Sequence, residues 1–134
     1  MTPGVFATAF TPNGQLIVSE NQPNNGTDTS SISSYTINAN GTVTAIGQSL
    51  PTLGNGNCWN VITPKGAWVY VDNPGTFTIA SFSIAANGAL APIAGTILST
   101  LPDGANNLDI TTSGDGTYLY DLNAGLGTIR CLHH

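Results

Sequence analysis

Charged side chains are scarce in this sequence. Only 7% of its 134 residues are Asp, Glu, Lys or Arg, against about a quarter in a typical soluble domain. Lys65 and Arg130 are the only Lys and Arg residues, and the formal net charge is -5. Such a chain repels polyanions and anionic lipid surfaces, so we expect neither a nucleic-acid partner nor a membrane partner.

Cysteine is also rare, and long apolar runs are missing. Cys58 and Cys131 are too few for a disulfide framework and lack metal-ligand spacing, so both are interpreted as small packing residues. No run approaches the roughly 20 apolar residues that span a bilayer. The start, 1–4, has no basic segment and no apolar stretch of a signal peptide. The low charge with many Asn and Thr residues nevertheless favours an exported or extracellular parent protein.

Glycine, in contrast, is plentiful, and it recurs in a pattern. Three stretches share a polar tight turn that closes on glycine, a short apolar and aromatic run, and an asparagine at the same distance from the glycine. The glycines are Gly14, Gly66 and Gly116, and the asparagines are Asn21, Asn73 and Asn123. A recurring asparagine is interpreted as a turn residue, because its side chain can mimic a backbone turn.

Aligning the three glycines predicts a unit of four antiparallel strands in about fifty residues. The turns before each second strand are expected to place glycine at positive φ, and the pairs Asn40-Gly41 and Asn87-Gly88 to accept two positive φ values. Residues 22–30 are expected to form a surface loop. The predicted strands are 5–10, 16–19, 32–37 and 42–47, then 57–62, 68–71, 79–84 and 89–98, then 107–112, 118–121 and 129–134.

Four-stranded meanders at this period are typical of β-propeller blades, which bury both faces against neighbouring blades. We therefore predict one all-β domain over residues 1–134, a partial β-propeller with blades at about 4–48 and 57–98 and an incomplete blade at about 107–134. Fewer than three blades would leave apolar faces uncovered at both ends. We expect self-association to cover them, with a homodimer closing a six-bladed ring favoured over larger rings. The alternative is a fragment of a longer propeller.

The chain resembles the lactonase-like β-propellers, the family that includes 6-phosphogluconolactonase, and the related surface proteins with YVTN repeats. The segment 70–73, Tyr-Val-Asp-Asn, resembles the YVTN signature, and the Thr-Pro-Asn-Gly and Thr-Pro-Lys-Gly turns resemble the Pro-Asp-Gly turn of the family. The resemblance covers nearly the whole chain and implies a propeller fold of about seven blades. The histidine, arginine and acidic groups associated with activity in that family have no matching position here. We therefore expect no catalysis by this chain alone.

Propeller ligands usually lie near the axis, on loops that enter first strands and leave second strands. The polar and aromatic residues in those segments are candidates for binding a small polar ligand or a neutral sugar, because amides both donate and accept and an indole stacks. The alternative is that Trp59 packs between blades while the asparagines bond to local backbone. The candidates are Glu20, Asn57, Trp59, Asn60, Asp72, Asn106, Asn107 and Asp109.

No metal or other cofactor is expected. Glu20 and Asp72 match in the glycine-based alignment, whereas Asp121 is one residue out of register, so its side chain should face the other way. A ring of three carboxylates around the axis, which would suit Ca²⁺, is therefore not expected. The sequence also contains no phosphate loop, catalytic triad or zinc spacing.

Three functional hypotheses follow. The first is a non-catalytic, self-associating propeller module that presents a small-ligand or protein-binding surface. The second is a fragment of a lactonase-like hydrolase whose catalytic residues lie elsewhere. The third is a carbohydrate-binding propeller, for which Trp59 is the residue to test.

Overall fold

The computed structural model describes residues 4–21 and 30–133, and every element in those two ranges is a β-strand. The predicted loop at 22–30 lies outside the described residues except for Ser30, and so does the segment 1–3. Within the part of the chain that is described, no helix is long and apolar enough to cross a membrane. The molecule is an all-β structure, as predicted.

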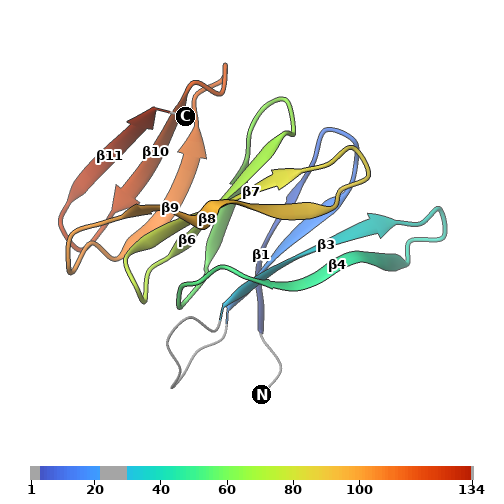
Figure 1. The fold of residues 1–134 in the computed structure, drawn as a ribbon, viewed down its shortest axis with the longest axis horizontal. Helices are drawn as coiled ribbons and strands as arrows, with labels where there is room; N and C mark the ends of the chain where they lie inside the picture. The colour runs from blue at the N-terminus through green and yellow to red at the C-terminus, as the bar shows by residue number, and fades with distance from the viewer. Residues whose placement is uncertain (1–3, 22–29, 134) are drawn as a thin grey trace.

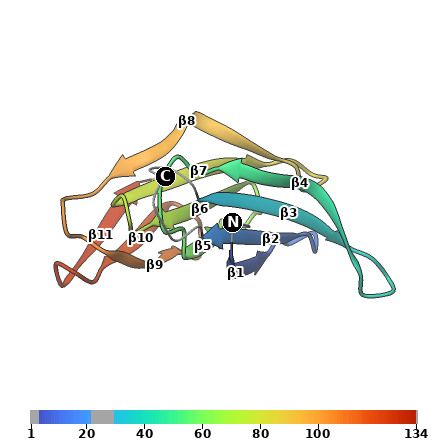
Figure 2. The same ribbon diagram turned by 90° about the horizontal axis from the view of Figure 1, so that it is seen from below.

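The strands form three antiparallel sheets (Figure 1). The first strands of the sheets lie beside one another, and Figure 2 shows β1 and β9 along one side of the molecule, with β4 and β8 along the other. Every predicted strand is present, with bounds shifted by a few residues. Sheet 1 contains β1 (Gly4–Phe10), β2 (Leu16–Asn21), β3 (Ser31–Ile37) and β4 (Val43–Pro51); sheet 2 contains β5 (Trp59–Ile62), β6 (Trp68–Asn73), β7 (Thr78–Ile84) and β8 (Leu90–Thr100); sheet 3 contains β9 (Asn107–Thr112), β10 (Tyr118–Asn123) and β11 (Thr128–His133).

The turns between first and second strands form as the sequence predicts. Gly14, Gly66 and Gly116 have φ of 84°, 72° and 77°, a region that glycine enters at no steric cost. Each of these glycines donates its N–H to the carbonyl three residues earlier. The positive-φ glycine therefore closes each hairpin.

The Asn-Gly turns differ from the prediction. Gly41 and Gly88 have positive φ, but Asn40 and Asn87 do not, so the expectation of two positive φ values is wrong. The physical reason is an Asx turn, in which the side-chain oxygen of each asparagine accepts the N–H two residues on, from Thr42 in one case. Only the glycine of each pair then has to adopt a positive φ.

The repeat in the first sheet is shifted by one residue. The backbone bond that closes the first turn runs from Thr11 N–H to the Gln15 carbonyl, four residues on, whereas the equivalent bond in sheet 2 spans five. Ser19 consequently pairs with Ile32 of β3, as Asp72 pairs with Ile79 of β7.

Two consequences follow for the alignment. Ser19, and not Glu20, holds the place of Asp72, and Glu20, and not Asn21, holds the place of Asn73. The prediction that Glu20 matches Asp72 is wrong, because equal distances from the glycine conceal a one-residue deletion in the turn.

Two apolar clusters join the sheets, and β6 contributes to both. Val69 and Val71 of β6 pack toward sheet 1 in a cluster with Ile17, Ile32 and Phe82. The alternate residue Tyr70 packs toward sheet 3, in a cluster with Ile79, Leu101, Ala105, Ile110 and Leu119. Successive side chains on a strand point to opposite faces, so a single strand faces both neighbours. We call the contact of sheets 1 and 2 the first seam and that of sheets 2 and 3 the second seam.

The remaining faces of sheets 1 and 3 have no sheet packed on them, and we call them the open faces. Most of the exposed large apolar side chains of the described residues lie there. On sheet 3 they are Tyr118, Tyr120, Leu122 and Ile129, on the side of β10 and β11 opposite Leu119. On sheet 1 they are Val5, Phe10, Ile37 and Val43, on the side opposite Ile17.

Candidate functional site

Two aspartates meet in the second seam. Asp72 lies on the side of β6 that faces sheet 3, beside Tyr70 and Ile79. Asp121 lies on the side of β10 that faces sheet 2, beside Leu119 and paired with Ile110. Because Asp121 is one residue out of register in the repeat, the two side chains point toward each other across the seam. Both residues are 0% exposed.

The electrostatics of this pair are unusual for a protein interior. Burial raises the pKa of Asp72 to about 9, and the neighbouring charge of Asp121 contributes in the same direction. Burial also raises the pKa of Asp121, although its contact with Asp72 opposes that effect. At neutral pH, Asp72 therefore holds a proton.

Two buried amides accompany the carboxyl groups. The side chain of Asn107 lies close to Asp72, and that of Asn123 lies close to Asp121. No donor meets any of the four carboxyl oxygens in hydrogen-bonding geometry, and the side-chain oxygens of both asparagines also lack a donor. The second seam thus gathers two carboxyl groups and two amides that contact one another, while their side-chain oxygens lack donors in good hydrogen-bonding geometry.

Two charged groups border this set. The positive charge of Arg130, which pairs with Asp121 on β11, lowers the pKa of that aspartate, but its Nη1 donates to the carbonyl of Thr100 at 3.4 Å. Asp109 is exposed, and its negative charge raises the pKa of Asp72. Neither charge forms an ion pair with the carboxyl groups among the described residues.

The predicted candidates Asn57 and Asn107 occupy equivalent positions and link neighbouring sheets. Nδ2 of Asn57 donates to the carbonyl of Ser31 at 2.8 Å, and Nδ2 of Asn107 donates to the carbonyl of Thr78 at 3.3 Å. Ser31 and Thr78 are the first residues of β3 and β7. Each amide therefore fastens the start of one sheet to the third strand of the sheet before it.

Asn60 lies at the first seam, whereas Trp59, which pairs with Asp72 in its own sheet, contacts both neighbouring sheets and packs against the apolar cluster of the second seam. The Trp59 ring is half-buried and meets Phe6 of β1 edge-on, with ring centroids 5.6 Å apart. Nδ2 of Asn60 donates to Oγ of Ser19 at 2.7 Å. The structure thus places Asn60 in a contact between sheets 1 and 2 and Trp59 in contacts with both neighbouring sheets, while Asn106 is exposed in the loop before β9.

Glu20 is separated from the other candidates. Its carboxylate is buried on the side of β2 that faces away from sheet 2, where it accepts hydrogen bonds from the hydroxyl groups of Ser31 and Ser33. The Ser33 bond is 2.7 Å long. The structure therefore brings Asp72 and Asn107 together and leaves Glu20 apart, while Asp109 pairs with Leu122 and lies exposed on the open face of sheet 3.

Sequence reasoning missed two members of the second-seam set, Asp121 and Asn123. The signal was present in the one-residue offset of Asp121, which was used to predict its direction but not its partner. Asp72 points from sheet 2 toward sheet 3. A side chain of sheet 3 on the opposite face from the Asp72-equivalent position points back toward sheet 2. The offset therefore indicates a meeting across the seam.

The two cysteines differ in exposure. Cys58 is half-buried, and burial raises the pKa of its thiol, whereas Cys131 is exposed, so its interpretation as a packing residue is wrong. Both thiols are free.

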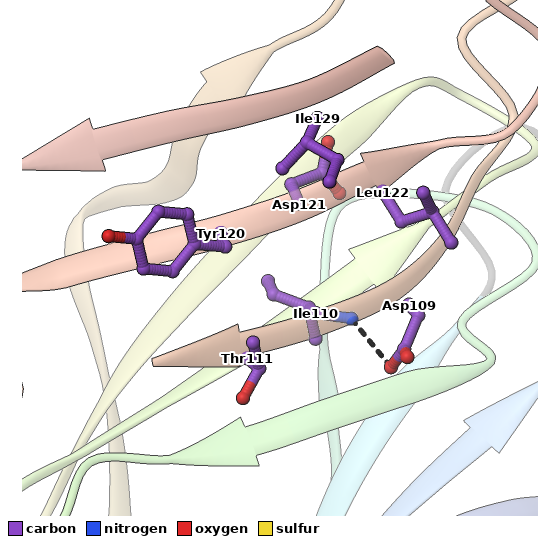
Figure 3. Close-up of a pocket in the computed structure, with 7 residues that line it drawn as sticks. All are labelled: Asp109, Ile110, Thr111, Tyr120, Asp121, Leu122 and Ile129. Carbon is purple, nitrogen blue, oxygen red and sulfur yellow. Dashed lines mark hydrogen bonds between the residues drawn. The ribbon is translucent and has the colours of Figure 1, made fainter. Parts of the chain in front are cut away.

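Among the described residues, no three His, Cys, Asp or Glu side chains lie together as a metal site. A pocket of about 220 Å³ opens on sheet 3 (Figure 3), lined by Asp109, Ile110, Thr111, Tyr120, Asp121, Leu122 and Ile129.

Solved structures share this arrangement of sheets. A putative 6-phosphogluconolactonase from Bacteroides uniformis superposes with a TM-score of 0.77 at 20% identity, over 95% of this chain and 38% of its own. The periplasmic gluconolactonase PpgL of Pseudomonas aeruginosa gives 0.75 at 20% identity, over 97% of this chain and 39% of its own. A protein from Lactobacillus plantarum gives 0.74 at 23% identity, over 96% and 37%.

The likeness is one of fold. No protein-family model and no curated protein matches the sequence. The chain spans less than two fifths of the length of the Bacteroides protein and a similar share of PpgL. Its unclosed set of antiparallel sheets, together with these neighbours, identifies the fold as a partial β-propeller, similar in its sheets to those lactonase-like proteins.

Proposed function

We propose that this chain is a non-catalytic, self-associating arc of a lactonase-like β-propeller. In the assembly, sheet 3 of each copy packs on sheet 1 of the other copy, and the two arcs close a ring. The observation that carries this proposal is the gathering of exposed apolar side chains on both open faces, where Phe10 is 63% and Ile129 is 71% exposed. Contiguous exposed apolar surface on a water-soluble protein marks a contact surface.

The second seam supports this use of the open face of sheet 3. Tyr120 and Leu122 hold the places on β10 that Tyr70 and Asp72 hold on β6, and Tyr70 is buried against sheet 3. Leucine in the place of Asp72 makes this open face more apolar than its buried counterpart. Covering it would bury each such side chain with a gain of about 1.5–3 kcal/mol.

The open face of sheet 1 supplies the complementary residues. Leu16 and Val18 hold the places on β2 that Leu119 and Asp121 hold on β10. A sheet 1 docked on sheet 3 as sheet 3 docks on sheet 2 therefore sets the position of Val18, which is only 5% exposed in the single chain, opposite Leu122. The carboxyl pair of the second seam is replaced by an apolar pair at the seam between copies.

Solution mass tests the proposal. We expect light scattering to report a dimer, and Leu122→Asp to convert it to a monomer because a carboxylate would enter an apolar contact. Leu98→Asp is the matched control, since Leu98 is 47% exposed against 41% for Leu122 but lies on β8, outside both open faces. A monomer that persists at high concentration in the unsubstituted protein would overturn the proposal.

A mixing experiment tests which faces meet. In a ring that joins sheet 3 to sheet 1, the variants Leu122→Asp and Phe10→Asp are each monomeric alone, because every contact contains a damaged face. Mixed together they form a heterodimer through one undamaged contact. A dimer of either variant alone would show that like faces pair, which contradicts the proposed geometry.

The fold neighbours favour a second candidate, a fragment of a lactonase-like hydrolase. PpgL is described as a gluconolactonase, and the Bacteroides protein as a putative 6-phosphogluconolactonase. Hydrolysis of glucono-lactone followed by pH-stat titration separates the candidates. Under the first proposal the rate equals that of buffer, and a rate that scales with protein concentration and is lost on denaturation would support the hydrolase.

A further inference from the structure

The geometry of the second seam points to a function beyond self-association: we infer that it is a binding site for a hard cation of the Ca²⁺ type, held by side-chain oxygens of Asp72, Asp121, Asn107 and Asn123. These ligands come from both sides of the seam, from β6 of sheet 2 and from β9 and β10 of sheet 3. A bound cation would therefore clamp the two sheets together.

The first support is the state of the oxygens. Asp72, Asp121 and Asn107 are 0% exposed and Asn123 is 3% exposed, yet no side-chain oxygen of the four meets an N–H or hydroxyl donor in hydrogen-bonding geometry, apart from the acid proton that Asp72 holds beside Asp121. The Nδ2 of Asn107 is engaged by the carbonyl of Thr78, which leaves its oxygen as the free end of the amide. Buried oxygens without donors are costly, and a cation satisfies several of them at once.

Glu20 is a buried carboxylate outside the proposed cation site, and its hydrogen bonding differs. Ser31 and Ser33 both donate hydroxyl groups to it from the neighbouring strand. Asp72 pairs across its sheet with Ile79 instead, and Asp121 pairs with Ile110 and Arg130. Among the described residues, no hydroxyl group donates to these two carboxyl groups, and the polar side chains beside them are the amides of Asn107 and Asn123.

The first seam provides an internal comparison. Ser19 holds the place of Asp72 there, and Val71 holds the place of Asp121. Asn57 repeats the backbone bond of Asn107 in that seam. Two sheets of this repeat therefore pack without the carboxyl pair, so the pair is not required for the fold.

The donor set selects the kind of cation. Carboxylate and amide oxygens are hard ligands. Cys58 lies near Asp72, but its thiol accepts a hydrogen bond from Nδ2 of Asn21 and burial raises its pKa, so it is a poor thiolate ligand for zinc. Ca²⁺ accepts irregular sets of six to eight oxygens, whereas Mg²⁺ demands a near-ideal octahedron. Two carboxylates balance a divalent charge, and Asp109 adds negative potential nearby. Arg130 is directed to the carbonyl of Thr100 and leaves the carboxyl oxygens free.

Thermal unfolding and direct binding test the site on the intact chain. After dialysis against EDTA, about 10 mM CaCl₂ should raise the Tm by about 5 °C if the Kd is near the millimolar values of many extracellular Ca²⁺ modules. Equal ionic strength supplied as NaCl should not. Equilibrium dialysis with radioactive calcium should find one Ca²⁺ per chain. No binding in that dialysis would overturn the inference without recourse to any variant.

A seam graft gives the matched control. The double variant Asp72→Ser with Asp121→Val copies the first seam and should fold, bind no Ca²⁺ and lose the Tm rise. Glu20→Gln, which removes a buried carboxylate outside the seam, should keep the rise. An equal rise in the grafted variant would refute the site. If the graft does not fold, the smaller change Asp121→Asn should weaken binding at least tenfold, and undiminished binding would refute the site equally.

Discussion

Asp72 of β6 and Asp121 of β10 face each other across the second seam, although they occupy different places in the repeat. Their meeting buries two carboxyl groups where the first seam has Ser19 and Val71. The strands, the apolar clusters and the inter-sheet amides around them repeat from one sheet to the next. The pair is the main departure from that repeat, and it has measurable consequences.

Stability should fall as pH rises in a buffer that contains a chelator. The pKa of Asp72 is raised from its ordinary 3.8 to about 9 in the folded state, so between these values the folded chain binds a proton that the unfolded chain does not. The free energy of unfolding then decreases with pH across that window, by at most about 1.4 kcal/mol per pH unit for one group.

Urea unfolding at pH 5, 7 and 9 measures this dependence. The variant Asp72→Asn should flatten it, because the amide imitates the protonated acid at every pH. Stability that rises from pH 5 to pH 9 in the unsubstituted chain would contradict the buried protonated carboxyl.

Loss of the inter-sheet amides should destabilise the arc. Asn57→Ala and Asn107→Ala each remove the donor to a buried carbonyl of the preceding sheet, with an expected cost of about 1–3 kcal/mol. Urea midpoints report the cost. Asn13→Ala, at an exposed turn position, is the control and should change stability by less than about 0.5 kcal/mol.

Substitution by alanine should have opposite effects on stability at two glycines of sheet 3. A Cβ at Gly125 would lie 2.0 Å from the carbonyl oxygen of Gly104, so the loop after β10 must shift, at a cost of about 1–3 kcal/mol. Gly114 has open space and no positive φ, so Gly114→Ala should be neutral or slightly stabilising. Thermal unfolding of both variants checks the pair, and equal Tm values would show that the contact at Gly104 is not tight.

The proposed dimer should be insensitive to salt. The open faces present Leu122, Ile129 and Phe10, and screening acts on charges and not on apolar burial. The dissociation constant measured by sedimentation should therefore stay within about threefold between low and high NaCl. A steep weakening with salt would indicate that charged groups, and not the open faces, hold the copies together.

Much of the fold could be predicted because its signals are local. The glycines at 14, 66 and 116 close hairpins through their own φ, and alternation of apolar and polar residues in segments such as 32–37 indicates a strand within a few residues. The two errors in the turns also have local causes. The Asn40 side chain makes its own Asx turn, and the first turn lacks a residue, which shifts Glu20 out of the place of Asp72.

The sequence by itself therefore determined the strands, the hairpins and the propeller class, because each depends on neighbours along the chain. Only the tertiary structure decided which side chains meet between sheets. Asp121 contacts Asp72, and Asn107 donates to the carbonyl of Thr78. Glu20 points away from sheet 2 and bonds to Ser33. A one-residue change of register moves a side chain to the opposite face of its sheet. The distance along the chain does not report that choice, and the candidate cation site depends on it.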